Sequence, residues 1–305
     1  MSPTVGSSPM YVVLGASGNT GSISADFLLT RGSKVRVVGR DAGRLRRFVR
    51  QGAEAFTADL SDAAALRKAL SGAHAAYLML PPISSRQEQE QQSDAIAKAA
   101  KESGLRYAVH LSSYGAQVPA GTGPVTGLHS AEQKLNAISD LNVLHLRPGY
   151  FMENNLAAID MIRGMGIFGH ALLPDLKLPM IATRDIGDYA ARRLLDLDFS
   201  GKQTFELLGQ RDLSIAEATA LIARGIGKPD LRYEQLPYDR IEQALTQMGF
   251  SPQKAAVYIE MFKAINAGVL VPLEVRSPQN TTPTTFETFV QDVFAPAYRA
   301  KASAA

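Results

Sequence analysis

Residues 10–40 read MYVVLGASGNTGSISADFLLTRGSKVRVVGR, and this stretch decides the fold. A short apolar run at 11–14 enters a turn that contains Gly15, Gly18 and Gly21. An apolar helical stripe follows at 23–28, and a β-branched run at 35–38 closes the unit. Strand, turn, helix and strand within about 30 residues is typical of a dinucleotide-binding βαβ unit.

The glycine turn is the part of this unit that would meet a ligand. Glycine lets the backbone approach a pyrophosphate closely, and the N–H groups and dipole of the following helix favour an anion. We therefore assign the turn to cofactor binding, through Gly15, Ser17, Gly18, Asn19, Thr20 and Gly21. An ordinary strand–helix turn without a ligand is the alternative interpretation.

The end of the second strand indicates which dinucleotide binds. NAD-binding folds usually place an acidic residue there for the ribose 2′-OH, whereas this chain has Gly39 and Arg40. An arginine matches a 2′-phosphate, which a carboxylate would repel. The pattern favours NADP(H), with Arg40 as its main contact. The arginines within 44–50 are also explained as the solvated face of a helix.

Composition excludes several classes of function. The chain has 305 residues, 46% hydrophobic and 20% charged, with a net charge of +3 that gives no reason to expect a nucleic-acid partner. Without cysteine, disulfides, thiolate catalysis and cysteine-ligated metals are excluded. No signal-peptide pattern and no apolar run of about 18 residues are present, so we expect a cytoplasmic protein that does not span a membrane.

Strands and helices alternate as far as residue 150. After a polar tail at 1–9, we expect a Rossmann-like α/β fold, with a doubly wound parallel sheet, over residues 10–150. Further strands are predicted at 53–58, 75–80, 107–112 and 143–146, and further helices at 45–49, 63–70, 86–103 and 131–138. Ser61 and Asp62 provide a cap for the helix at 63–70.

Beyond residue 150 the alternation weakens. We expect residues 151–305 to form a smaller, mostly helical lobe that closes over the nicotinamide end of the cleft, although later segments can return to the sheet. Predicted helices lie at 151–163, 184–197, 214–226, 238–248, 252–267 and 286–293, with strands at 204–208 and 231–236 and a glycine-rich loop at 164–169. Ser214 and Glu217 suit a capping box.

Ligands of such sheets bind across the carboxyl ends of the strands, so the residues after each strand are site candidates. Asp59 would accept a hydrogen bond from the adenine amino group, or else serve only as a helix cap. The further cofactor-binding candidates are Leu60, Leu80, Pro81, Ser112, Pro148, Tyr150 and Asn154.

Four segments together resemble one known family. GASGNTG after the first strand, VVGR at the end of the second, the LSSYGA segment, and LRPGYFMENN after the sixth are similar to the NmrA-like group of atypical short-chain dehydrogenases/reductases, over roughly residues 10–275. The resemblance implies a Rossmann domain with a small C-terminal domain and NADP(H) as cofactor. It also implies one of two functions, reduction of quinones, dyes or similar flat compounds, or cofactor sensing with a protein partner.

The superfamily's proton relay, Tyr-x-x-x-Lys, is absent, because no tyrosine here has lysine four residues later. His129 stands where the catalytic tyrosine is expected, with Gln133 four residues on and Lys134 one place further. Several family members carry His-x-x-x-Lys, so this chain departs from that pattern too. Lys134 would point about 100° away from Gln133 on a helix.

Other residues offer chemistry in place of that relay. Ser112 and Tyr114 suit donors to an oxyanion, and His129 could supply a proton because its ordinary pKa is close to working pH. A surface histidine and a strand-end hydroxyl bonded to backbone are the structural alternatives. His110 and His145 lie in predicted strands and are interpreted as core groups, and no histidine spacing predicts a metal site.

The sequence thus favours an NADPH-dependent reductase of a small, flat, apolar acceptor such as a quinone. A redox sensor that binds NADP(H) and a protein partner without catalysis is the alternative, favoured by the missing relay. An epimerase or dehydratase of nucleotide sugars is disfavoured for the same reason. Substrate identity and oligomeric state are not determined by these patterns.

Overall fold

The computed structural model describes residues 9–82 and 84–303. Apart from Pro9, the tail expected at the N-terminus therefore lies outside the described residues. The chain forms two compact units that alternate along the sequence. The first contains residues up to 112, 127–146 and 186–205, and the second contains residues 113–126, 147–185 and those from 206 onward.

The first unit is built on a seven-stranded sheet with the order β10-β6-β5-β4-β1-β2-β3. The pairs from β3 across to β6 are all parallel. This order confirms the predicted doubly wound sheet. The strands are β1 (Met10–Leu14), β2 (Lys34–Gly39), β3 (Glu54–Thr57), β4 (Ala75–Met79), β5 (Tyr107–Leu111), β6 (Asn142–Pro148) and β10 (Lys202–Leu207).

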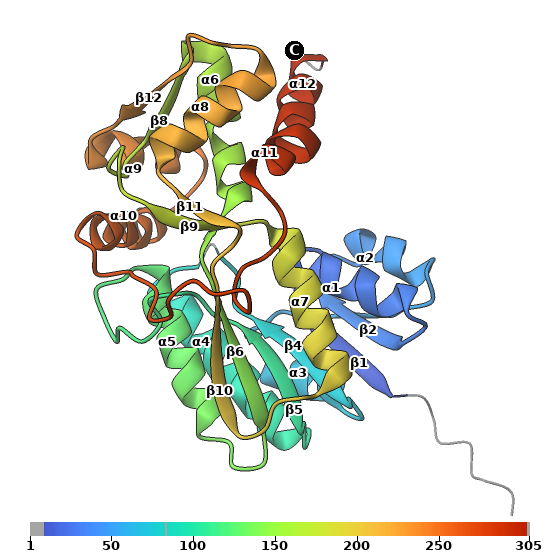
Figure 1. Ribbon diagram of the computed structural model, residues 1–305. Coiled ribbons are helices and arrows are strands. Elements are labelled where there is room, and N and C mark those ends of the chain that lie inside the picture. The colour runs from blue at the N-terminus through green and yellow to red at the C-terminus, as the bar shows by residue number, and fades with distance from the viewer. Residues whose placement is uncertain (1–8, 83, 304–305) are drawn as a thin grey trace, which may run out of the picture. The chain divides into compact units, whose positions relative to one another are not determined.

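Helices cover both faces of this sheet (Figure 1), which is why its central strands are apolar on both sides. On one face, α3, α4 and α5 contribute the alanine and leucine side chains of the main core. On the other face lie α1, α2 and α7. The bounds are α1 (Asn19–Thr30), α2 (Ala42–Val49), α3 (Ala63–Leu70), α4 (Arg86–Glu102), α5 (Pro124–Asn136) and α7 (Thr183–Asp196).

Side-chain caps fix where these helices begin. The Asp62 carboxylate accepts from the backbone N–H groups of Ala64 and Ala65 at 3.0 Å, which confirms the predicted cap of α3. Asp41 caps α2 in the same way. Ser85 and Glu88 form a capping box at the start of α4.

The second unit combines short sheets with helices. One sheet has the order β11-β9-β7 and another pairs β12 with β8. Ser214 and Glu217 form the predicted capping box of α8. The strands are β7 (Tyr150–Phe151), β8 (Ile167–His170), β9 (Leu178–Ile181), β11 (Arg211–Leu213) and β12 (Arg232–Gln235), and the helices are α6 (Ile159–Met165), α8 (Ile215–Ile226), α9 (Tyr238–Gln247), α10 (Pro252–Asn266), α11 (Phe286–Phe289) and α12 (Ala295–Ser303).

Two local predictions in this unit are wrong. The segment predicted as one helix at 151–163 begins with β7, continues as a 3₁₀ helix (Met152–Ala158) and becomes α6 only at Ile159. Pairing of Tyr150 with Met180 and of Phe151 with Ile181 holds its start extended. The predicted loop at 164–169 contains most of β8, and only Gly166, with a φ of 72°, ends α6.

No helix within residues 9–82 and 84–303 has both the length and the apolar character needed to cross a membrane.

Candidate functional site

The glycine turn between β1 and α1 is wound tightly. Gly15 has a φ of 65°, in the left-handed region that favours glycine, and the Gly18 N–H donates to the Gly15 carbonyl oxygen at 2.8 Å. A Cβ on Gly21 would lie only 2.5 Å from that same oxygen. Gly18 begins α1 without a side-chain cap. The first-turn N–H groups of α1 are therefore suited to an anion from outside the chain.

Two buried hydrogen bonds anchor α1 behind this turn. The Thr20 hydroxyl lies 2.8 Å from the Tyr77 hydroxyl on β4. The Ser24 hydroxyl donates to the carbonyl oxygen of Gly187 on α7 at 3.0 Å. Thr20 thus braces the helix start from within, while Gly15, Ser17 and Asn19 remain partly or fully exposed on the turn.

Cationic side chains gather at the carboxyl ends of β1, β2 and β3. Arg44 on α2 donates from Nη2 to the carbonyl oxygen of Ser17 at 2.9 Å, so its guanidinium lies against the glycine turn. Arg40 lies near enough to Asp59 to help lower the pKa of that carboxyl. Sequence reasoning grouped Arg44 with the solvated helix arginines, and its place in the first turn of α2 was the signal that could have distinguished it.

Asp59 is held in a local turn. Its Oδ1 accepts from the backbone N–H of Ser61 at 2.9 Å and from the Ser61 hydroxyl at 2.6 Å. These two bonds are the main reason why the pKa of Asp59 is lowered. Asp62, not Asp59, caps α3. Leu60 and Leu80 are buried beside these strand ends, and Pro81 is half-buried.

Ser112, at the end of β5, is engaged by a buried carboxylate. Its hydroxyl donates to Oε1 of Glu132 on α5 at 2.5 Å, and both side chains are almost fully buried. Sequence reasoning missed Glu132, although its place three residues after His129 on the same helix was a signal. His129 itself is half-buried on α5.

The two strand histidines are core groups, as predicted. Nδ1 of His110 lies 2.9 Å from Nδ1 of His145, and Nε2 of His145 lies 3.0 Å from Oδ1 of Asn136. Burial, reinforced by the neighbouring His145, lowers the pKa of His110 to about 3. In the part of the chain that the structure describes, no cluster of three or more His, Asp or Glu side chains is suited to a metal ion.

Lys134, which stands one place beyond the position expected for the relay lysine, is held by polar side chains of α4. Its Nζ lies 2.7 Å from carboxylate oxygens of Glu90 and Asp94 and donates to the Ser93 hydroxyl at 2.8 Å. All three acceptors are on α4. The lysine therefore ties α5 to α4.

In the second unit, Tyr114 and Tyr150 come together because the Tyr114 N–H donates to the carbonyl oxygen of Pro148 at 3.1 Å. The Tyr114 side chain is 5% exposed, and its hydroxyl has no hydrogen-bond partner among the described residues. Tyr150 is hydrogen-bonded to the Asn154 side chain. Burial raises the pKa of both tyrosines well above the usual range, and each hydroxyl therefore stays protonated.

Glu153, within the RPGYFMEN stretch, holds the start of α7 at Thr183. Both of its carboxylate oxygens lie 3.0 Å from the backbone nitrogen of Thr183, and Oε1 accepts from the Thr183 hydroxyl at 2.7 Å. Burial raises the pKa of this carboxyl despite those bonds. Gly149 allows β9 to approach, since a Cβ there would lie 2.2 Å from the Pro179 carbonyl oxygen.

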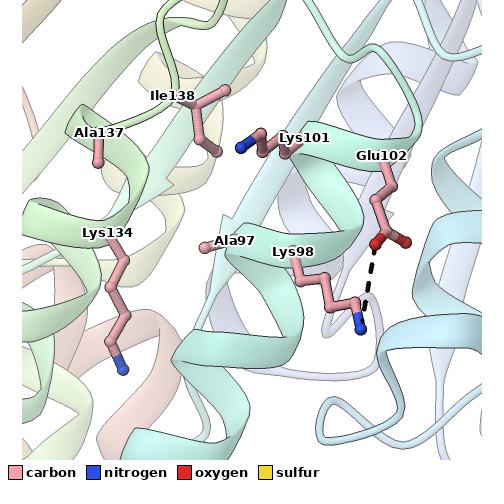
Figure 2. Close-up of a pocket in the computed structure, with 7 residues that line it drawn as sticks. All are labelled: Ala97, Lys98, Lys101, Glu102, Lys134, Ala137 and Ile138. Carbon is pink, nitrogen blue, oxygen red and sulfur yellow. Dashed lines mark ion pairs between the residues drawn. The ribbon is translucent and has the colours of Figure 1, made fainter.

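A hollow lies between α4 and α5, and Lys134 is the one candidate residue named above that lines it (Figure 2). It is found toward the C-terminal ends of both helices, and these ends lie near the amino ends of the strands in a βαβ fold. Lys98 and Glu102 form an ion pair across 4.0 Å at its rim. The lining residues are Ala97, Lys98, Lys101, Glu102, Lys134, Ala137 and Ile138.

Comparison with known proteins connects this geometry to one family. The sequence model of the NmrA-like family matches residues 9–290. Quinone oxidoreductase 2 of Escherichia coli (strain K12) is 27% identical over 245 residues, which cover 79% of this chain and 82% of that protein.

Solved structures share the fold. The NADPH-dependent quinone oxidoreductase QOR2 of Escherichia coli, crystallised with NADPH, aligns with a TM-score of 0.79 at 22% identity, covering 93% of this chain and 99% of that one. NmrA, a negative transcriptional regulator crystallised with NADP, aligns with a TM-score of 0.71 at 16% identity, covering 96% of this chain and 98% of that one.

Proposed function

This chain belongs to the NmrA-like family, and we propose that it is an NADPH-dependent oxidoreductase that reduces a small, flat electrophile such as a quinone. The relative at 27% identity carries the name of a quinone oxidoreductase, and structural neighbours are crystallised with NADPH or NADP. The residues of this chain supply further support, first for the cofactor and then for the acceptor.

The glycine turn and the cations beside it suit NADP(H). Because Gly21 has no Cβ, α1 packs closely against the Gly15 carbonyl oxygen. The uncapped start of α1 then fits a pyrophosphate, held by residues 15–21. Arg40 and Arg44 suit a 2′-phosphate, for which a guanidinium is a matched donor. Leu60, Leu80 and Pro81 would line the dinucleotide, with Ser112, Pro148, Tyr150 and Asn154 toward its reactive end. The cofactor supplies a hydride when bound.

The observation that carries the catalytic proposal is the unpaired Tyr114 hydroxyl. A buried polar group without a partner costs free energy, so it is a natural donor for a ligand oxygen. Reduction of a quinone leaves negative charge on its oxygen, and Tyr114 would stabilise that charge. Its raised pKa keeps the proton on the tyrosine during this step.

A quinone also explains why the Tyr-x-x-x-Lys relay is dispensable. The reduced acceptor is a phenolate, whose conjugate acid has a pKa near 10, as a phenol does. Such an oxygen takes its proton from water or from His129 without a dedicated strong acid. Reduction of a simple ketone gives a far more basic alkoxide, which does need one. Ser112 is then a weaker candidate, because its hydroxyl already donates to Glu132.

Oxidation of NADPH against a panel of tail-free benzoquinones and naphthoquinones tests the proposal, with NADH and simple aldehydes alongside. We expect turnover of quinones, preference for NADPH and no reduction of aldehydes. Tyr114→Phe should lower kcat about 10²-fold, the usual effect of removing one oxyanion donor.

The outcome that would contradict the reductase is tight NADPH binding without turnover on any acceptor. That result would favour a cofactor-sensing protein with a protein partner. The observation on that side is the engagement of Lys134 by Glu90 and Asp94, which leaves α5 without a relay lysine.

A further inference from the structure

The segment 268–275, which follows α10, presents a row of apolar side chains to solvent. Its sequence is GVLVPLEV. Val269, Val271, Leu273 and Val275 are 41%, 47%, 64% and 87% exposed, whereas the residues between them are at least half-buried. We call these four side chains the apolar strip. Four exposed large aliphatic residues in seven positions are unusual for a soluble surface without a ligand.

The segment that contains the strip lies beside the residues that follow Tyr114. Leu270 packs on Gly115, whose Cβ, if it had one, would lie 2.2 Å from Leu270 Cδ2. Gln117 donates from Nε2 to the carbonyl oxygen of Val271 at 3.2 Å. Residues 270–271 therefore run beside 115–117, which directly follow Tyr114 in the chain.

Charge is kept away from this strip. Glu274 is the one ionisable residue in 268–275, and its carboxylate accepts from the Glu206 backbone N–H at 3.2 Å and from the Asn280 side chain at 3.2 Å. Arg276, just beyond, is engaged by the Leu208 and Gly209 carbonyl oxygens and by Asp212. The surface along the strip therefore has the chemistry of a hydrocarbon contact.

We propose that the apolar strip binds the aliphatic tail of the acceptor, which makes the substrate an alkyl- or prenyl-substituted quinone. This inference rests on the proposed reductase function, whose acceptor ring lies at Tyr114. Six residue steps of extended chain span at most about 20 Å, so the strip accommodates a tail of some fifteen carbons at the most. A tail held on one face would gain about half the full transfer free energy, or roughly twofold in affinity per methylene.

Calorimetry on the NADP-loaded protein tests the tail site apart from turnover. The probes are benzoquinones with one common head group and unbranched tails of zero to ten carbons, kept below their aggregation limits. We expect Kd to fall about twofold per methylene in the unaltered protein. The double variant Leu273→Asn, Val275→Thr should lose most of that dependence and bind the tail-free quinone unchanged.

A matched control is Met248→Asn, which alters a side chain of the same unit that is 65% exposed and outside the strip. It should keep the tail dependence. An equal dependence on tail length in the double variant overturns the tail site, even if tail-free quinones are reduced. A normal tail dependence without turnover of any quinone instead overturns the reductase and leaves the strip as a lipid-tail site.

A membrane surface is the competing occupant. Sedimentation with phosphatidylcholine vesicles separates the two. Vesicle binding that the double variant abolishes, with no effect of tail length on quinone Kd, would assign the strip to the bilayer and overturn the proposal.

Discussion

Removal of the Tyr114 hydroxyl should affect the stability of the protein and its activity in opposite directions. Since it is buried without a partner, replacing it by hydrogen removes a desolvation cost. We predict that Tyr114→Phe leaves the free energy of unfolding unchanged or raises it by about 1 kcal/mol, while kcat falls. Urea denaturation measures the first quantity.

Tyr77→Phe is the matched control for that prediction. Its hydroxyl is buried too, but lies 2.8 Å from the Thr20 hydroxyl. Loss of this bond should lower the free energy of unfolding by about 1 kcal/mol. If Tyr114→Phe costs as much as Tyr77→Phe, the Tyr114 hydroxyl has a partner in the folded protein and the donor role falls.

Substitution of Arg44 tests whether the protein prefers NADPH to NADH. Its guanidinium already lies at the glycine turn, bonded to the Ser17 carbonyl oxygen. Arg44→Gln removes a charge-assisted bond to the proposed 2′-phosphate, so the Kd for NADPH should rise by about tenfold or more, with little change for NADH. Calorimetry with both nucleotides measures this. Arg50→Gln, on the exposed end of the same segment, should change neither Kd, and an equal loss of both nucleotides in Arg44→Gln would refute the assignment.

Among the elements, α5 depends on α4 through Lys134. Its ammonium contacts Glu90, Ser93 and Asp94 and is only partly exposed. Lys134→Met should lower the free energy of unfolding by about 1–2 kcal/mol, because it leaves two carboxylates without their cation. The exposed Lys98, paired with Glu102 at 4.0 Å, gives a control variant, Lys98→Met, with a change below about 0.5 kcal/mol.

Enzyme kinetics distinguishes this structural role from a catalytic one. Lys134→Met should keep kcat and its pH profile at temperatures where the variant is folded. A large loss of kcat in a folded variant would place Lys134 in the proton relay after all.

Elements with a local signal could be predicted from the sequence. The β1–α1–β2 unit has a continuous apolar run, a glycine turn and an apolar stripe within one stretch, and each of these patterns is complete without distant residues. The caps at Asp62 and Ser214 are local in the same sense. That is why the parallel sheet and its order of helices were predictable.

Elements fixed by distant partners could not be predicted. Tyr150 and Phe151 are extended because they pair with β9, about 30 residues later. Likewise, the Arg44 side chain is held by the Ser17 carbonyl oxygen, and the Glu132 side chain is held by the Ser112 hydroxyl. No sequence spacing rule links the two residues of either pair. The part of the candidate site in the glycine turn could therefore be predicted from local sequence, whereas the rest depends on tertiary contacts.

Considered as a whole, the molecule has a histidine with a lowered pKa in each of its two units, His110 in the first and the half-buried His170 in the second. Burial lowers the pKa of His110 to about 3 and that of His170 to about 4, below the ordinary value of 6.5. Below pH 6.5 the unfolded chain binds protons at these sites and the folded chain does not, so acid favours unfolding. Their stabilisation is complete above pH 6.5 and is lost progressively as the pH falls.

The magnitude follows from the linkage relation, about 1.4 kcal/mol per pH unit for each fully depressed histidine. His110 should contribute close to this value and the half-buried His170 less. We predict that urea midpoints fall steadily between pH 6.5 and 5, before most carboxylates titrate. His170→Gln, which removes one titrating group, should flatten that slope. Midpoints independent of pH over this range would mean that both rings take up protons in the folded protein as readily as in the unfolded chain, and so are reached by water.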